Sequence, residues 1–275
     1  MSNALDTLIP QADDGSVVLA QLSDPHLFAE RDNVFLGINP YNSLRAVVEQ
    51  MRGEAGVDAV LATGDLSQDH SVESYQRFAE LVEPLAKPVF SLPGNHDQAE
   101  LMHAALAPTH VHVQRRVQIG AWQVLMLNSA VTGLPAGHVM LEELRWLQQV
   151  LAEDQATPTL IALHHHPVPT GCAWLDQHSL DNGAEFLALL ARYPNVKGVV
   201  FGHVHQEMDQ FSHHIRLMAV PSTSIQFLPR SAGFVLDPRQ PGYRLLRLCP
   251  DGSIETQVKR LIGGQFVPDP SASGY

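Results

Sequence analysis

Residues 88–97, PVFSLPGNHD, place a short apolar segment directly before a glycine and three polar residues, Asn95, His96 and Asp97. A short apolar run that ends in this way is typical of a buried strand followed by a sharp loop. The same arrangement recurs along the chain at residues 17–26 (VVLAQLSDPH), 57–65 (VDAVLATGD), 159–166 (TLIALHHH) and 196–205 (VKGVVFGHVH). Because functional groups collect at the carboxyl ends of strands in α/β sheets, these five segments predict one shared site.

Between the strands, apolar residues recur at helical spacing. Helices are predicted at residues 43–53, with Ser43 as the N-cap, and near residues 75–85, 141–151 and 184–192. Hairpins are predicted over residues 111–127 and 243–260. Strands and helices alternate early and β-structure dominates late, which favours an α/β fold of two packed sheets flanked by helices.

The domain organisation follows from where this pattern begins and ends. Residues 17–262 are predicted to form a single domain, because no linker or repeat interrupts them. Residues 1–16 are predicted to be a flexible leader, and the Gly-, Pro- and Ser-rich residues 263–275 a flexible tail.

Charge and composition exclude several classes of function. The 17 lysine and arginine residues are outnumbered by 29 acidic ones, giving a formal net charge of −12, whereas a nucleic-acid coat protein needs a basic stripe. No stretch approaches the roughly 20 apolar residues of a membrane span, and the start of the chain does not resemble a secretory signal. Cys172 and Cys249 fit free thiols in a reducing compartment. We therefore expect a soluble cytoplasmic protein without a nucleic-acid or membrane partner.

The polar residues at the strand ends form a mixed oxygen and nitrogen ligand set. It contains two carboxylates, one amide and at least four imidazoles, drawn from Asp24, His26, Asp65, Asn95, His164, His165, His166, His203 and His205. Such a set suits manganese, iron or zinc, and it is too large for one tetrahedral ion. It fits a pair of ions about 3.5–4 Å apart that share a bridging carboxylate.

Each motif taken alone also fits a structural role. Asp24 and His26 could form a turn with a helix N-cap, and Asp65 after a glycine is an ordinary turn residue. His203 and His205 could share one face of an exposed strand. The occurrence of all five motifs at strand ends favours the metal site over these separate explanations.

Taken in order, the motifs D-x-H (Asp24, His26), GD (Asp65), GNHD (residues 94–97), H-x-P (His165) and GHVH (His203, His205) resemble the calcineurin-like metallophosphoesterase superfamily. Residues 163–180, LHHHPVPTGCAWLDQHSL, and residues 220–227, VPSTSIQF, most resemble the bacterial class III 3′,5′-cyclic AMP phosphodiesterases. The resemblance implies a four-layer αββα sandwich with a dinuclear site at the strand ends.

The resemblance also implies residue roles. One ion would be held by Asp24, His26, Asp65 and His205, and the other by Asp65, Asn95, His165 and His203, with Asp65 as the bridge. His96 would face the scissile phosphate rather than bind metal, and His26, Asn95 and His205 would also contact substrate. His164 and His166 would support the site from outside the ligand set. Iron and manganese are the expected metals, with zinc and cobalt as alternatives.

The loop at residues 169–182 is expected to select the substrate. Trp174 could stack on a purine and His178 could reach a phosphate or ribose oxygen, although Trp174 could equally close the core beneath the loop. Cys172 is expected to be a packed side chain, because metal-hydroxide chemistry needs no thiol nucleophile.

The expected function is hydrolysis of 3′,5′-cyclic AMP to 5′-AMP by attack of a metal-bridging hydroxide, with His96 assisting the leaving 3′-oxygen. One alternative is the same chemistry on a glycerophosphodiester, a nucleotide or a phosphomonoester. The alternative from another class is a non-catalytic metal-binding scaffold. The expected binding partner is therefore a small-molecule substrate, a cyclic nucleotide. The resemblance also implies that the protein could form a homodimer.

Overall fold

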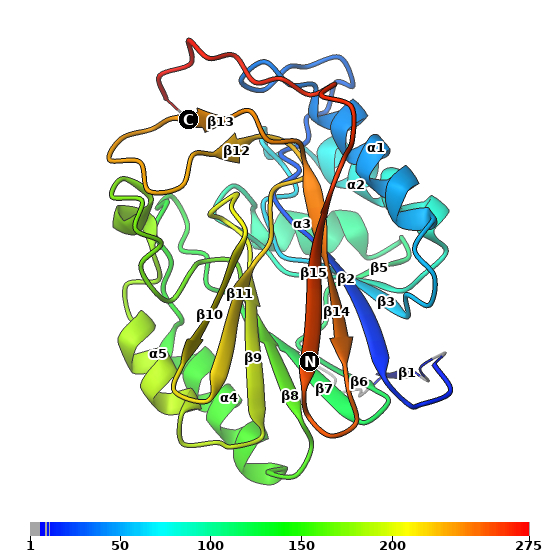
Figure 1. The fold of residues 1–275 in the computed structure, drawn as a ribbon, viewed down its shortest axis with the longest axis vertical. Helices are drawn as coiled ribbons and strands as arrows, with labels where there is room; N and C mark the ends of the chain where they lie inside the picture. Colours follow the sequence, from blue (N-terminus) through cyan, green and yellow to red (C-terminus); the bar gives the residue numbers. More distant parts are fainter. Residues whose placement is uncertain (1–5, 9, 11, 275) are drawn as a thin grey trace.

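Within residues 6–8, 10 and 12–274, which the computed structural model of the protein describes, two large β-sheets pack face to face and helices cover their outer faces (Figure 1). The first sheet has the order β1-β6-β7-β8-β9-β11-β10. Its strands are β1 (Asp6–Leu8), β6 (Arg116–Ile119), β7 (Trp122–Met126), β8 (Thr159–Ala162), β9 (Val196–Phe201), β11 (Ile215–Ala219) and β10 (Met208–Ser212). Strands β7, β8, β9 and β11 run parallel, so their carboxyl ends share one edge.

The second sheet has the order β15-β14-β2-β3-β4-β5. Its strands are β15 (Ile254–Arg260), β14 (Gly242–Leu248), β2 (Val17–Leu22), β3 (Ala59–Ala62), β4 (Val89–Ser91) and β5 (Val111–His112). From β2 to β5 the pairing is parallel, whereas β14 runs antiparallel to β2. A short ladder joins β12 (Gln226–Phe227) to β13 (Leu236–Asp237).

The helices divide between the two outer faces. In Figure 1, α1 (Pro40–Arg52) and α2 (Val72–Val82) lie on one side of the molecule, and α4 (Leu141–Glu153) and α5 (Gly183–Leu190) on the opposite side. The short helix η1 (Glu83–Leu85) follows α2, α3 (Ala99–Leu106) packs with α2, and η2 (Leu175–His178) precedes α5. This is the predicted α/β architecture of two mixed sheets flanked by helices.

Three apolar clusters hold the layers together. In β2, Val17 and Leu19 join the cluster between the sheets, while Ala20 and Leu22 join the cluster beneath α1 and α2. A third cluster packs α4 and α5 on the first sheet. Because neighbouring side chains of a strand point to opposite faces and both faces are covered, the strands read as continuous apolar runs.

Several local predictions need correction. Helix α1 begins at Pro40, because Asn39 caps it by accepting the Asn42 N–H at 2.8 Å; Ser43 lies inside the helix and donates to the Thr223 carbonyl instead. The predicted hairpin over 111–127 is only β6 with β7, since β5 pairs with β4 in the other sheet. Helix α3 and edge strand β10 were not predicted; β10 is largely exposed and lacks an apolar run.

Described residues on both sides of 17–262 make contacts with the body of the protein. Residues 1–5, 9 and 11 of the predicted leader lie outside the described residues, but β1 within it pairs in parallel with β6. In the predicted flexible tail, Phe266 exchanges two hydrogen bonds with the Gln240 side chain, and the Asp269 N–H donates to the Leu36 carbonyl at 2.8 Å. These pairings tie residues 266–269 to the body of the protein.

Candidate metal centre

The carboxyl ends of β2, β3 and β4 in one sheet and of β8 and β9 in the other meet at the same edge of the sandwich. Each is followed within a few residues by candidate ligands, which the structure brings together: Asp24, His26, Asp65, Asn95, His165, His203 and His205. The backbone N–H of Asp24 donates to the Gly64 carbonyl, and that of His26 to the Asp65 carbonyl, both at 3.0 Å. The loops after β2 and β3 are therefore fixed to each other directly.

The backbone at the site is strained. Five candidate ligands have left-handed backbone angles, with φ of 55° at Asp24, 51° at His26, 52° at Asp65, 65° at His203 and 49° at His205. For a residue other than glycine, this conformation costs about 1–2 kcal/mol. Strain of this kind persists where the surroundings fix it, and it concentrates at functional sites.

Gly94 shows how closely the loops approach. A Cβ atom at this position would overlap the Asp65 carboxylate. The absence of a side chain there lets the His96 N–H donate to Asp65 Oδ1 at 2.8 Å. The glycine of the GNHD motif thus brings the β4 loop onto the β3 loop.

The first cluster of candidate ligands is Asp24, His26 and His205, all fully buried. His205 Nε2 lies 3.3 Å from Asp24 Oδ1 and 3.2 Å from His26 Nε2. Two imidazole nitrogens and a carboxylate oxygen thus converge on one point.

The second cluster is His164, His165 and His203, with ring centroids 4.7–5.1 Å apart. His164 Nε2 lies 3.1 Å from Asn95 Oδ1 and 3.2 Å from Asp65 Oδ2. Asp65 Oδ2 is also 3.9 Å from His26 Nε2. The Asp65 carboxylate therefore stands between the two clusters, where a bridging ligand would be.

Partners outside the clusters orient the imidazoles. His26 Nδ1 contacts Gln68 Oε1, His205 Nδ1 contacts the Ile225 carbonyl, and His165 Nδ1 contacts Ser129 Oγ, each at 2.8 Å. A carbonyl can only accept, so Nδ1 of His205 carries the hydrogen and Nε2 presents its lone pair to the cluster. This support of one ring nitrogen while the other faces the site is characteristic of metal-binding histidines.

Unpartnered buried atoms test whether the residues fit metal ions. His165 Nε2 and both ring nitrogens of His203 are buried without a hydrogen-bond partner among the described residues. A buried polar atom left in this way costs about 1–3 kcal/mol. Cations would give these atoms partners, and the mixed oxygen and nitrogen donors suit first-row divalent metals.

The protonation states also fit metal binding. Burial lowers the pKa of His26 to about 3, and burial also holds the pKa values of His165 and His203 well below the usual value. Burial alone would raise the pKa of Asp65, but the nearby imidazoles of His164 and His96 outweigh it and hold that pKa well below its usual range. Neutral imidazoles and an ionised carboxylate are the forms that ligate cations.

Asn95, His96 and His203 line a cleft of about 800 Å³. The His96 ring stands edge-on to the His26 ring, with centroids 5.0 Å apart. The same cleft is lined by Asn128, residues 130–135, Leu175 and His178. It has room for a molecule larger than a phosphate group, and two of the candidate ligands, Asn95 and His203, form part of its wall.

Of the two residues predicted to contact substrate from the 169–182 loop, only His178 lines this cleft. Trp174 instead packs edge-on against Phe227 and Phe234, with ring centroids 4.9 and 5.3 Å away. Its surroundings match the alternative in which it closes the core beneath the loop. Cys172 is buried, as expected of a packing side chain.

His164, expected to support the site from outside the ligand set, contacts both Asp65 and Asn95. Sequence reasoning did not find several other contributors to the site. Ser129 and Gln68 lie outside the five motifs, so their support of His165 and His26 had no sequence signal. His70 also lines the cleft. Its position five residues after the GD motif was the only sequence feature that placed it near the site.

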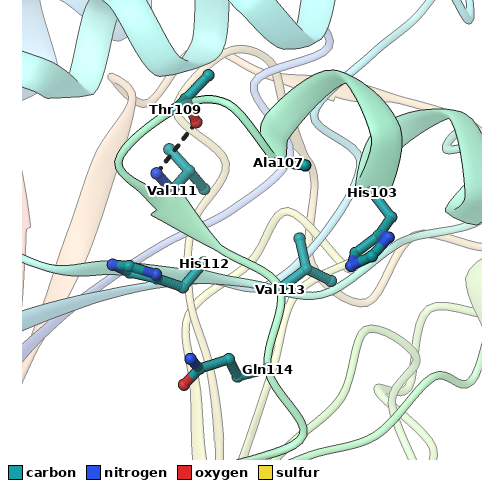
Figure 2. A pocket seen from close by; sticks show the side chains of 7 residues that line it. All are labelled: His103, Ala107, Thr109, Val111, His112, Val113 and Gln114. Carbon is teal, nitrogen blue, oxygen red and sulfur yellow. Dashed lines mark hydrogen bonds between the residues drawn. The ribbon is translucent and has the colours of Figure 1, made fainter. Parts of the chain in front are cut away.

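A second hollow, of about 240 Å³, lies at the sheet edge formed by β5. Figure 2 shows the imidazoles of His103 and His112 on opposite sides of Val113, so they do not converge. Thr109 Oγ1 accepts the Val111 N–H at 3.1 Å and shapes the turn into β5. This hollow does not gather ligands as the strand-end cleft does.

Comparison with known families gives a match to the calcineurin-like phosphoesterase model over residues 17–207. This chain belongs to the calcineurin-like phosphoesterase family. The fold of this family implies a dinuclear metal site, in agreement with the clustered histidine and aspartate side chains. None of the described helices is long and apolar enough to cross a membrane.

Curated relatives cover nearly the whole chain. The 3′,5′-cyclic adenosine monophosphate phosphodiesterase CpdA of Escherichia coli K12 is 44% identical over 269 residues, 97% of this chain and 98% of its own. CpdA of Vibrio vulnificus is 46% identical over 264 residues, covering 95% and 96%. A 3′,5′-cyclic-nucleotide phosphodiesterase of Nostoc is 38% identical over 248 residues, covering 89% and 92%.

Solved structures agree on the fold. A purple acid phosphatase from yellow lupin aligns with a TM-score of 0.67 at 16% identity, covering 93% of this chain and 53% of the lupin chain. A dimetal phosphatase from Danio rerio aligns with a TM-score of 0.60 at 14% identity, covering 89% and 98%. At this identity the likeness concerns the fold alone.

Proposed function

We propose that this protein is a metal-dependent phosphodiesterase that hydrolyses 3′,5′-cyclic AMP to 5′-AMP. The observation that carries the proposal is the Asp65 carboxylate standing between two imidazole clusters, beside a cleft lined by Asn95, His96 and His203. The identity of 41–46% with proteins named as cyclic AMP phosphodiesterases supports the choice of substrate.

The proposed ligands are divided between two ions. Asp24, His26, Asp65 and His205 would hold the first, and Asp65, Asn95, His165 and His203 the second. Iron or manganese fits this donor set best, with zinc and cobalt as alternatives. When bound, two such ions supply an activated water and positive charge beside the phosphorus.

The protein's own groups do the remaining work. His96 lines the cleft and is held by its backbone N–H on Asp65, so its imidazole is placed to donate a proton or hydrogen bond to the departing 3′-oxygen. An alkoxide is a poor leaving group, and such donation is typically worth about 10²–10⁴ in rate. Asn95 and His203 line the same cleft and would orient the phosphodiester.

The test is a comparison of substrates with metal-loaded protein. We expect kcat/KM to be highest for cyclic AMP among cyclic AMP, cyclic GMP, bis(p-nitrophenyl) phosphate and p-nitrophenyl phosphate. A preference for the monoester would contradict the diesterase assignment, and equal rates on all diesters would contradict the cyclic AMP assignment. No turnover of any of them, with both ions bound, would favour a metal-binding scaffold.

We also infer that residues 17–262 form one catalytic domain that acts in the cytoplasm, and the family resemblance implies a homodimer as one state of the protein. The buried Cys172 and the separate Cys249, both free thiols, support a reducing compartment. The net charge of −12 is unfavourable for a nucleic-acid partner. Light scattering on purified protein tests the dimer, and a monomeric mass would contradict it.

A further inference from the structure

The cleft extends well beyond the candidate ligands, to a loop that the sequence motifs do not include. Residues 129–138 leave the end of β7 and return to their starting point, where the His138 N–H donates to the Ser129 carbonyl at 2.9 Å. We call residues 129–138 the cleft loop. Compact surface loops with closed ends are frequently functional.

The tip of the cleft loop is a tight turn with an exposed apolar side chain. The Leu134 N–H donates to the Val131 carbonyl at 3.0 Å, and Gly133 between them has φ of 77°, which favours glycine at this turn position. Leu134 is 54% exposed, and both Leu134 and Val131 line the cleft. Apolar surface left open beside a polar metal site suits an apolar part of the ligand.

The cleft loop is fixed to the metal centre at its first residue. Ser129 Oγ contacts His165 Nδ1 at 2.8 Å and accepts the His165 N–H at 3.2 Å. The distance between the candidate ligands and the Val131–Leu134 turn is therefore set by the fold.

The far end of the cleft loop is paired with the segment that follows η2. The Gly137 N–H donates to the Ser179 carbonyl at 3.2 Å, and the Asp181 N–H donates to the Gly137 carbonyl at 2.9 Å. Because η2 ends directly before Ser179, this pairing joins the cleft loop to the end of η2. His178, the last residue of η2, lines the same cleft. The apolar side chains of Val131 and Leu134 and the polar side chain of His178 therefore line the same cleft. A purine has apolar faces and polar edges, so it could contact both kinds of group.

We infer that the Val131–Leu134 turn, together with η2, binds the nucleobase of the substrate, with the phosphodiester at the metal end of the cleft. This inference rests on the proposed function and assigns the role first expected of Trp174 to a different segment. Leu134 would contact the face of the base, and His178 would contact its polar edge.

The test separates base binding from phosphate binding. Leu134→Ala should lower the ratio of kcat/KM for cyclic AMP to that for methyl p-nitrophenyl phosphate, a diester without a base, by about tenfold. The change should lie in KM rather than kcat. Leu141→Ala, which truncates a leucine of similar exposure (58%) at the start of α4 outside the cleft, is the matched control and should leave this ratio unchanged.

A binding measurement distinguishes failure of this inference from failure of the proposed function. By calorimetry, Leu134→Ala should weaken binding of AMP about tenfold and leave binding of ribose 5-phosphate unchanged. If the wild type does not hydrolyse cyclic AMP but shows this difference, the base site stands and the substrate assignment fails. Unchanged AMP affinity, or equal loss for both ligands, would overturn the base site even in an active phosphodiesterase.

Discussion

The backbone N–H of His203 donates to both carboxylate oxygens of Asp24, at 3.1 Å each. Asp24 follows β2 in one sheet and His203 follows β9 in the other, so this contact joins the two halves of the sandwich. The same carboxylate lies 3.3 Å from His205 Nε2. Asp24 therefore fixes the GHVH loop in place, and it would also offer an oxygen to the first of the two proposed ions.

These two roles of Asp24 can be separated by substitution. Asp24→Asn keeps an acceptor for the His203 N–H but removes the negative charge, so we expect it to lose the first ion and at least 100-fold in kcat while remaining folded. Asp24→Ala should in addition lose about 1–3 kcal/mol of unfolding free energy, because the N–H is left without its acceptor. Metal analysis and urea titration measure the two effects; full metal content in Asp24→Asn would contradict the ligand role.

His96 is expected to affect turnover without affecting metal content. His96→Ala should keep both ions and lower kcat by about 10²–10⁴, since it removes the proton donor and no proposed ligand. His103→Ala, which truncates an exposed histidine on α3, is the control. Wild-type kcat in His96→Ala would remove this residue from the mechanism.

The adjacent histidines His164 and His165 are predicted to respond differently. His165 has Nε2 buried without a partner, whereas His164 contacts the Thr63 carbonyl through Nδ1 and Asn95 and Asp65 through Nε2. We expect His165→Ala to lose one ion per chain and His164→Ala to retain two ions that bind more weakly. Elemental analysis after dialysis decides between them, and the opposite pattern would make His164 the ligand.

Asp176 gives a pH-dependent prediction. The imidazole of His166, 3.7 Å away, and hydrogen bonds from Thr170 lower the pKa of Asp176 to about 2. A lowered carboxyl pKa stabilises the fold above the ordinary value of 3.8 and ceases to do so as pH falls toward 2. The stability difference between wild type and Asp176→Asn should therefore be larger at pH 5 than at pH 2.5. A difference that grew on acidification in chemical denaturation would contradict this.

The tail contacts predict an effect of truncation. Ending the chain after Gly264 removes the hydrogen bonds from Phe266 to Gln240 and from Asp269 to Leu36, each worth about 1 kcal/mol. We expect the unfolding free energy to fall by roughly 3 kcal/mol, the sum over these three hydrogen bonds, and Tm by several degrees. Ending the chain after Pro270 keeps these contacts and is the control; equal Tm values for both truncations would show that the tail contributes nothing.

The sequence was sufficient to predict the convergence of the site, because parallel strands align their carboxyl ends and each motif followed an apolar run. It was not sufficient for interactions set by distant partners. Edge strand β10 carries the polar sequence MDQFS and forms only because β11 is beside it. The position of Trp174 depends on Phe227 and Phe234, which come from another part of the chain. Support of His165 by Ser129 likewise depends on the pairing of β7 with β8.

The position of β2 between β3 and β14 has a consequence for biosynthesis. The strand that precedes Asp24 is made well before its β14 neighbour, Gly242–Leu248, because β3 to β13 lie between them in the chain. Until then β2 has an open edge, and such edges are prone to pairing with other chains. Nascent or prematurely terminated chains should therefore depend on chaperones and be cleared as misfolded, rather than persist as partly active fragments.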